Sequence, residues 1–300
     1  SADADQKPYE VHIGYITVKW GDTPEEQTKL TVYRGASSVT YLDPAAGQTV
    51  RFAAVKMRDD RYWAPINVGA TTAKNKAATS GNITADCGKL FQWGRYSGVD
   101  AYSSGGDVYA GTDRPVGTME GALPNMTTWD GQHIKSNSSD PNTRNNWLQF
   151  VADTDNPEPG SMVEGAWYQQ LWNANEGKEN TDVVKTAADP CPEGWRVPTQ
   201  AEWVAIGADN STVYTTWSPD NLNLSIPGKE SGQNLVLPAA GYRSNGTGAS
   251  VNQGAYGDYW SSSVPSGSLN ASCVYFINIG KLSTYTNYRA YGYSVRCVQE

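Results

Sequence analysis

Hydrophobic and polar positions alternate over short distances in much of this chain, which is the pattern of β-strands. Residues 11–20, VHIGYITVKW, alternate loosely and are rich in β-branched and aromatic side chains, and they predict a strand. The same reasoning predicts strands at residues 30–33, 39–41, 49–57, 235–242, 257–262, 272–279 and 291–298. The chain is therefore expected to be β-rich, with many turns between short strands.

Two segments carry helical signals instead. Large apolar residues recur at i, i+4 and i+8 over residues 162–175, the spacing of one face of an amphipathic helix. Thr199 and Glu202 form a capping box, in which hydroxyl and carboxylate each satisfy a free amide at a helix start. That second helix is predicted to run to about Ile206.

The positions of strands and turns divide the chain into a β-rich lead, residues 1–48, and a larger domain, residues 49–300. The lead is close to the lower size limit for an independent core, so it is expected to pack on the larger domain. Residues 99–160 are dense in Gly, Ser, Asn, Asp and Pro. They predict a long irregular region that is either functional or packed by its own aromatic side chains.

Composition indicates what kind of core and partner to expect. The 300 residues are 38% hydrophobic but include 11 Trp and 18 Tyr, so the core should be largely aromatic. A net charge of −8 disfavours nucleic acid as a partner, because phosphate binding needs clustered Lys and Arg. No apolar run approaches the roughly 18 residues that span a bilayer, so no transmembrane segment is predicted. The polar opening SADADQKPYE is typical of a trimmed mature exported protein or of an expressed fragment.

The residues that carry most catalytic chemistry are few. The four cysteines show no CxxC spacing and there are two histidines, which argues against a Cys/His metal centre. Four cysteines allow three pairings, and the sequence selects none of them. Neither His12 nor His133 lies in a triad motif, so each is expected to be an ordinary surface or half-buried side chain.

Acidic loop residues offer two further hypotheses. Asp130, Asp153, Asp155 and Glu158 could pair as glycosidase carboxylates, but a solvated acidic loop is the favoured interpretation. The segment DTDNPEP, residues 153–159, could supply oxygen ligands for a structural calcium ion, although it lacks the glycine and spacing of an EF-hand loop. No cofactor is therefore expected, with structural calcium as the alternative.

Six strings point to a known family when they are taken in order: YWAPINVGAT, CGKLFQWGR, NWLQ…LW…DPCPEGWRVPTQAEW, LPAAGYR, YWSSS and YGYSVRCV. The chain resembles the Fibrobacter succinogenes major paralogous domain family over residues 50–300, a family common in exported proteins and fimbrillin-like lipoproteins of Bacteroidetes. RVPTQAEW, residues 196–203, is also similar to the RLPTEAEW string of formylglycine-generating sulfatase-modifying enzymes, whose fold is related to C-type lectins.

The resemblance implies an α+β, C-type-lectin-like fold. This fold has a twisted antiparallel sheet, one or two helices and long irregular loops, here after the short β-rich N-terminal segment. It implies that Cys191 and Cys297 form a disulfide between the start of the capped helix and the last strand. Cys87 and Cys273 remain, and they either pair with each other or stay as buried free thiols.

The same resemblance implies an exported protein at the outer membrane or cell surface, with a lipid anchor upstream of Ser1 left open. The expected role is non-enzymatic binding of carbohydrate or of a host or bacterial surface protein, as in an adhesin or fimbrial tip. A pilus subunit that assembles by strand addition is the alternative. Catalysis by a redox-active thiol is disfavoured, because no basic residue or helix start accompanies Cys273 to lower its pKa.

Residue type and loop position suggest where a ligand would bind. Sugars stack on exposed aromatic rings, while amides, carboxylates and guanidinium groups bond their hydroxyls. Trp260, in the YWSSS string, is instead expected in the core. The predicted ligand-binding residues are Tyr102, Tyr109, Trp129 and Asp130, with Arg243 and Asn245 as second choice.

Overall fold

The computed structural model describes most of the two terminal thirds of the chain and parts of its middle. Within these ranges the protein is mostly β-sheet with two short α-helices, which agrees with the predicted α+β class at the level of secondary structure. The described residues are 12–21, 23, 27–34, 39–102, 108–109, 129–136, 146–148, 171–173, 183–209, 215–265, 268 and 270–300.

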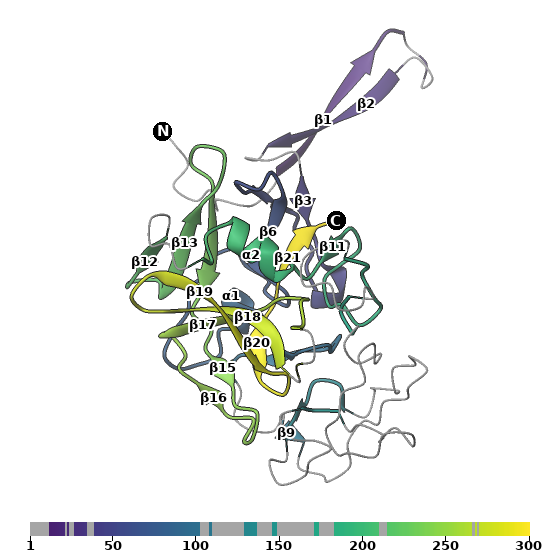
Figure 1. Cartoon of the computed structure of the whole chain (residues 1–300). Helices are drawn as coiled ribbons and strands as arrows, with labels where there is room; N and C mark the ends of the chain where they lie inside the picture. The colour runs from purple at the N-terminus through teal and green to yellow at the C-terminus, as the bar shows by residue number, and fades with distance from the viewer. Residues whose placement is uncertain are drawn as a thin grey trace.

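The first two strands form a ribbon that projects from the rest of the molecule (Figure 1). β1 (His12–Lys19) pairs antiparallel with β2 (Gln27–Arg34) along its whole length, which confirms the first predicted strand. β3 (Thr40–Tyr41) then pairs with β4 (Phe52–Ala53), and Tyr41 is fully buried. The lead thus contacts the rest of the chain through β3, while a domain boundary at residue 48 stays a prediction.

The largest sheet has eight strands and carries most of the C-terminal third. Its order is β16-β15-β20-β17-β18-β19, and β20 also pairs with β7, which pairs with β8. The hairpin of β18 and β19 keeps an unbroken antiparallel register. The strands are β7 (Lys89–Gln92), β8 (Val99–Asp100), β15 (Tyr242–Arg243), β16 (Ser250–Val251), β17 (Tyr256–Trp260), β18 (Asn270–Ile277), β19 (Lys281–Tyr288) and β20 (Gly292–Ser294).

Three smaller sheets complete the described structure. A four-stranded sheet has the order β11-β21-β6-β5, a three-stranded sheet the order β12-β13-β14, and β9 and β10 form a parallel pair. The last strand of the chain therefore lies between strands from its beginning and its middle. The strands are β5 (Val55–Lys56), β6 (Tyr62–Asn67), β9 (Val108–Tyr109), β10 (His133–Ile134), β11 (Trp195–Arg196), β12 (Thr216–Ser218), β13 (Asn223–Pro227), β14 (Asn234–Pro238) and β21 (Arg296–Gln299).

The capping box forms as predicted at helix α2 (Gln200–Ala205). Thr199 Oγ1 accepts a hydrogen bond from the Glu202 amide at 3.2 Å, and Glu202 Oε2 accepts one from the Thr199 amide at 2.8 Å. The same carboxylate pairs with Arg196 at 2.6 Å. The other helix, α1 (Thr84–Cys87), is one turn long, and a 3-10 turn, η2, spans Pro44–Ala46. Neither α-helix of the described residues has the length and apolarity to cross a membrane.

Tryptophan dominates the core, as the composition predicts. Each indole that is buried needs a hydrogen-bond acceptor, and most find a backbone carbonyl. Trp260, which is fully buried as predicted, donates to the Phe91 carbonyl at 2.7 Å. Trp93 donates to the Ser261 carbonyl at 2.8 Å. The fully buried tryptophans are Trp63, Trp93, Trp147, Trp172, Trp203 and Trp260.

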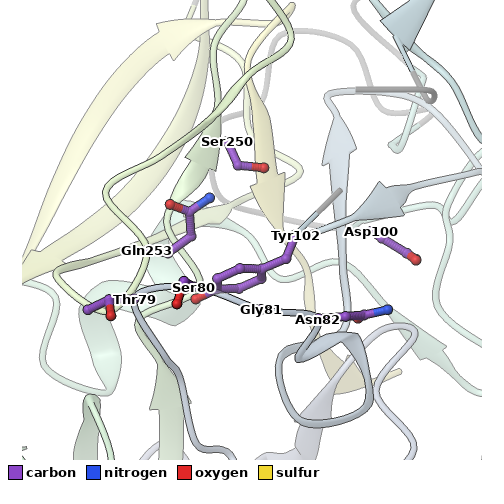
Figure 2. A pocket seen from close by; sticks show the side chains of 8 residues that line it. All are labelled: Thr79, Ser80, Gly81, Asn82, Asp100, Tyr102, Ser250 and Gln253. Atoms are coloured by element: carbon purple, nitrogen blue, oxygen red, sulfur yellow. The ribbon is translucent and has the colours of Figure 1, made fainter. Parts of the chain in front are cut away.

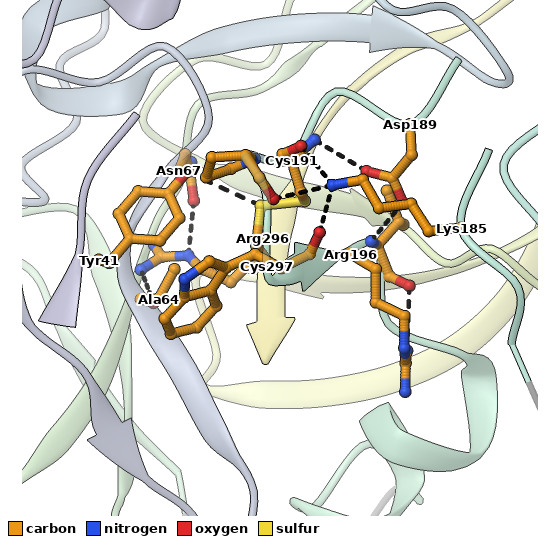
Figure 3. Close-up of a disulfide and its surroundings, with 12 residues drawn as sticks. Tyr41, Ala64, Asn67, Lys185, Asp189, Cys191, Arg196, Arg296 and Cys297 are labelled. Carbon is orange, nitrogen blue, oxygen red and sulfur yellow. Dashed lines mark hydrogen bonds between the residues drawn. A yellow bond between two sulfur atoms is a disulfide. The ribbon is translucent and has the colours of Figure 1, made fainter. Parts of the chain in front are cut away.

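Cys191 and Cys297 form a disulfide, as the resemblance implies (Figure 3). The loop that begins at Cys191 is fixed by two buried side chains that precede it. The Asp189 carboxylate accepts hydrogen bonds from the amides of Cys191 at 2.8 Å and Val197 at 2.9 Å. Lys185 Nζ donates to the carbonyls of Cys191 at 2.6 Å, Pro192 and Trp195. The bridge therefore joins a rigid loop before α2 to strand β21.

Cys87 and Cys273 are both buried and unpaired, so a second disulfide does not form. Each thiol lies among core side chains of its own cluster, Cys87 in the one around Trp63 and Trp203, Cys273 in the one around Trp260. The alternative of two buried free thiols is confirmed.

Several predicted elements differ in extent from the observed ones. The predicted strand 49–57 is divided between β4 and β5, which belong to different sheets. The predicted strand 235–242 ends at Pro238 in β14, and Tyr242 begins β15 in the eight-stranded sheet. Of the predicted helix 162–175 the structure describes Leu171, Trp172 and Asn173, which are not helical; Asn173 forms a β-bridge with Lys185. The rest of that helix and the acidic segment 153–159 lie outside the described residues.

Candidate functional site

An open cleft of about 560 Å³ lies where the loop after β6 approaches β8 and β16. Figure 2 shows the ring of Tyr102 in its middle, with the loop of residues 79–82 on one side and Ser250 and Gln253 on the other. Tyr102 is the one lining residue that was among the predicted ligand-binding residues. The cleft is lined by Thr79, Ser80, Gly81, Asn82, Asp100, Tyr102, Ser250 and Gln253.

The side chains of the cleft are polar and short of positive charge. They supply one carboxylate, two amides, three hydroxyls and one aromatic ring, and no Lys, Arg or His stands among the lining residues. Amides both donate and accept hydrogen bonds, and hydroxyls do so with adjustable direction. The arrangement therefore suits a neutral ligand with several hydroxyl groups better than an anion.

Tyr102 is fixed in the cleft by its own hydrogen bond. Its hydroxyl donates to the carbonyl of Ala78, the residue just before the loop that forms the opposite wall. Burial raises the pKa of this phenol well above its usual value. The ring is consequently held between the core and the cleft and presents part of its surface to a ligand.

Arg243 lies behind the cleft instead of in it. The side chain is 1% exposed, and it donates to the Asp100 carbonyl from Nε at 3.2 Å and from Nη2 at 2.6 Å. Its Nη1 donates to the Gly248 carbonyl at 2.9 Å. Arg243 was predicted to contact a ligand directly, but its side chain is buried. Its guanidinium group instead joins the Asp100 carbonyl to the Gly248 carbonyl.

The chain around β16 reaches the cleft because glycine stands at position 241. Gly241 has φ +70°, and a Cβ there would lie 2.3 Å from the Val251 carbonyl oxygen. Ser250 Oγ donates to the Ala101 carbonyl at 2.8 Å and so ties this wall to the end of β8. The string LPAAGYR thus shapes the cleft through Gly241 and Arg243.

The other predicted ligand residues lie together beside β9 and β10. The Tyr109 ring packs edge-on against Trp129, with centroids 6.2 Å apart, and the Trp129 carbonyl accepts a bond from Arg95 at 2.6 Å. Asn245 Nδ2 donates to Ser136 Oγ at 3.2 Å. Tyr109, Trp129 and Asn245 are therefore partly engaged in packing, and none of them lines the cleft of Tyr102.

Asp130 is exposed and borders a second, smaller depression of about 280 Å³. Its lining includes Lys89, the exposed Tyr96 and the buried Asp43, whose pKa burial raises. Its charged groups are the carboxylates of Asp43 and Asp130 and the ammonium of Lys89, so the depression lacks the uniform polar lining of the larger cleft.

His133 was predicted to be a surface or half-buried residue, and this prediction is wrong. Its side chain lies in β10 and is 1% exposed. Burial, with Arg243 and Arg95 nearby, lowers the pKa of its imidazole to about 3. The ring is therefore neutral near pH 7 and is enclosed by protein, away from any ligand.

The described residues contain no group of three or more His, Cys, Asp or Glu placed to hold a metal ion. The two free thiols are equally unsuited to chemistry, because burial raises the pKa of both Cys87 and Cys273. Neither free cysteine therefore offers an accessible thiolate.

Sequence reasoning missed most of the cleft. Asn82, Asp100, Ser250 and Gln253 come from four separate turns or strand ends, and only the fold brings them together. The usable signal was the polar run TSGN at residues 79–82, placed between two strongly hydrophobic segments.

Comparison with known proteins gives one match. The model of the Fibrobacter succinogenes major domain matches residues 119–299, a shorter span than the resemblance over residues 50–300. Neither curated proteins nor solved structures gave a match. Since the matched residues make up more than half of the chain, the protein belongs to the Fibrobacter succinogenes major domain family.

Proposed function

We propose that this protein is a non-enzymatic, cell-surface binding protein that recognises carbohydrate in the cleft around Tyr102. The observation that carries the proposal is the lining of that cleft, which combines one carboxylate, two amides, three hydroxyls and an aromatic ring. A pyranose offers hydroxyls around its edge and C–H groups on its faces. The polar groups would bond the edge while the Tyr102 ring packs against a face.

Rigidity of the walls supports binding at low entropic cost. Arg243, Ser250 and Tyr102 each bond a backbone carbonyl near the cleft, at Asp100, Ala101 and Ala78. A site whose groups are already positioned loses less conformational freedom when it binds a ligand. Sugars bind weakly per contact, so such preorganisation matters for them.

Binding is favoured over catalysis on two grounds. Asp100 is the one carboxylate that lines the cleft, whereas most glycosidases use a pair on either side of the scissile bond. Thiol oxidation of the formylglycine-generating type needs an accessible thiolate, and the two free thiols are buried with raised pKa values. We accordingly propose a C-type-lectin-like binding domain that needs neither cofactor nor calcium in this cleft.

Family membership and the Cys191–Cys297 disulfide support an exported location, since disulfides persist in oxidising compartments. The proposed partners are glycans or glycoproteins of a host or bacterial surface. An adhesin role follows if the glycan is displayed by another cell.

The experiment is a glycan array and host-glycoprotein screen, with and without EDTA, on the wild type and on Asn82→Ala and Gln253→Ala. Each variant should weaken a glycan hit at least tenfold without changing the melting temperature, and EDTA should have no effect. Asn278→Ala, on the exposed turn after β18, is the matched control. Silence of the wild type, or a hit that both cleft variants retain, would overturn the proposal.

A second function is favoured by the projecting ribbon of β1 and β2 (Figure 1), and we propose it as the alternative: a structural subunit of a surface assembly. Tyr15 is 59% exposed, Ile16 54% and Trp20 62%. Two-stranded ribbons are only marginally stable in water, and exposed apolar side chains in one place indicate a contact surface. Sedimentation velocity at increasing concentration tests this, since Ile16→Lys should abolish any assembly formed by the wild type. A wild type that stays monomeric would exclude self-assembly.

A further inference from the structure

One face of the eight-stranded sheet carries tyrosines from five strands. Register places Asp258 of β17 directly opposite Tyr275 of β18, so both project from the same face. Tyr285 of β19 meets Tyr275 with ring centroids 6.0 Å apart. We name this surface the tyrosine face, and it comprises Tyr242, Tyr256, Tyr275, Tyr285, Tyr291 and Tyr293.

The rings nearest Asp258 form a contiguous cluster. Tyr291 lies nearly parallel to Tyr288 and to Tyr293, with centroids 6.2 and 5.7 Å away. Tyr242 meets Tyr291 edge-on at 5.7 Å and Tyr293 at 6.2 Å. Tyr293 is buried, Tyr242 and Tyr291 are half-buried, and Tyr288 is 37% exposed, so the cluster runs from the interior to the solvent.

Asp258 lies within this cluster without a counter-charge. Its side chain is 7% exposed, and its Oδ2 atom has no hydrogen-bond partner among the described residues. No ion pair joins it to a Lys or Arg of the described chain. Burial raises the pKa of its carboxyl group to about 8. Burial also raises the pKa of Tyr242, Tyr291 and Tyr293, and the charge of Asp258 adds to that rise. A buried carboxyl group with an unpaired oxygen is destabilising, and such a group calls for an explanation.

We propose that Asp258 and the rings of Tyr242, Tyr291 and Tyr293 form a binding site for an organic ammonium group, such as a lysine side chain or a quaternary amine. An ammonium ion is attracted to the electron-rich faces of aromatic rings, and this attraction strengthens where water is excluded. The same cation supplies the counter-charge that Asp258 lacks in the protein. Tyr242 and Tyr291 are half-buried, so these two rings are the part of the site that a cation in solvent can reach first.

A metal ion fits this place poorly, because hard cations need several oxygen ligands and Asp258 brings one carboxylate. The site is also separate from the cleft around Tyr102. Tyr242 and Arg243 are neighbours on β15 and so point to opposite faces, Arg243 toward the cleft and Tyr242 toward the tyrosine face. The inference therefore stands independently of the proposed carbohydrate site.

The test is calorimetric titration with tetramethylammonium and with n-butylammonium chloride, at constant ionic strength against sodium chloride. Both cations should bind saturably to the wild type. Because Asp258 must ionise to pair with the cation, binding at pH 7 should release close to one proton, measured in buffers of different ionisation enthalpy. Tyr275 lies opposite Asp258 on β18, and Tyr256 precedes it on the same face of β17. The other titratable groups around Asp258 are Tyr242 on β15, Cys273 on β18, and Tyr291 and Tyr293 at β20, whose raised pKa values keep them neutral at this pH.

Asp258→Asn keeps the shape of the side chain and should reduce affinity at least tenfold and abolish proton release. Asp220→Asn, at an exposed turn, is the matched control and should bind as the wild type does. Should Asp258→Asn not fold, Tyr291→Leu, at the half-buried edge of the cluster, gives a second test through at least a fivefold loss of affinity. Wild-type protein that binds neither cation, binding unchanged in the variants, or equal Asp258-dependent binding of neutral methyl glucoside would each overturn the proposal.

Discussion

At the scale of single residues, the polar groups inside this protein divide into those that are satisfied and those that are not. Arg243 is buried, yet its guanidinium group donates to the carbonyls of Asp100 and Gly248. Asp258 is also buried, and one of its oxygens has no partner among the described residues. The first residue holds the structure together, whereas the second weakens it.

Replacing Arg243 should destabilise the protein and weaken ligand binding in the cleft, because its guanidinium group supports the backbone at Asp100. Arg243→Met leaves the Asp100 and Gly248 carbonyls without their donor, and each unsatisfied buried group costs about 1–3 kcal/mol. Unfolding in urea should show that loss of stability, and binding to any glycan identified on the array should fall at least tenfold. Arg51→Met, at an exposed position, should change neither quantity. Unchanged stability would show that water or other groups replace the guanidinium group.

Replacing Asp258 should have the opposite effect on stability, in a pH-dependent way. Its pKa is about 8 in the folded protein against an ordinary value of 3.8, so the folded state holds a proton that the unfolded state releases between these values. Stability from this group is therefore complete below pH 4 and falls as pH rises toward 8, at about 1.4 kcal/mol per pH unit. Asp258→Asn removes that slope, and urea unfolding at pH 4, 6 and 8 should show the variant gaining on the wild type as pH increases. Parallel pH profiles for the two proteins would contradict the expectation.

At the scale of elements, local signals predicted the structure where the contacts are local. The capping box at Thr199 and Glu202 needs four consecutive residues, and it formed as expected. Strand β19 was not predicted, since KLSTYTNY is polar and its hydrophobic contrast is weak. Its place is set by eight pairs with β18, a partner that hydrophobic pattern alone does not identify.

Because the hydrophobic pattern does not identify distant partners, most residues of the candidate site were not predicted either. Tyr102 was predicted as a ligand-binding residue because an aromatic residue in a loop is conspicuous on its own, and it lines the cleft. Asn82, Asp100 and Gln253 are unremarkable in isolation, and they line one cleft only because β8, β16 and the loop after β6 converge. Arg243 was assigned to the ligand because sequence alone does not show that the Asp100 carbonyl lies within its reach.

The capping box gives a prediction at this scale. Thr199→Ala removes the acceptor for the Glu202 amide and should lower the free energy of unfolding by about 1 kcal/mol. Thr216→Ala, at an exposed position of the short strand β12, should have a smaller effect. Chemical denaturation of both variants provides the comparison, and equal losses would mean that the cap contributes little to α2.

At the scale of the whole molecule, one covalent bond closes a large part of the chain. The disulfide has a sequence separation of 106 residues and joins the loop before α2 to strand β21. A bridge over so long a loop restricts the unfolded chain strongly, and removing such a bridge typically costs about 2–5 kcal/mol.

Thiol chemistry should separate the bridge from the free cysteines. Native protein should resist iodoacetamide, because Cys87 and Cys273 are both buried. Mass spectrometry should find two modified thiols after unfolding in urea and four after unfolding with reductant. The Cys191→Ala, Cys297→Ala double variant should unfold at lower urea concentration than the wild type. Modification of two thiols in the native protein would show that the two free cysteines are accessible.

The disulfide also determines how the protein would respond to a pulling force. If tension were applied between a point before Cys191 and the end of β21, the load would pass through the sulfur–sulfur bond and bypass the chain between them. That bypassed segment includes Ser250, Gln253 and the strands of the tyrosine face. The C-terminal parts of both proposed sites would therefore stay folded under tension until the bridge was reduced. Under the same force, reduced protein would unfold and extend through this segment.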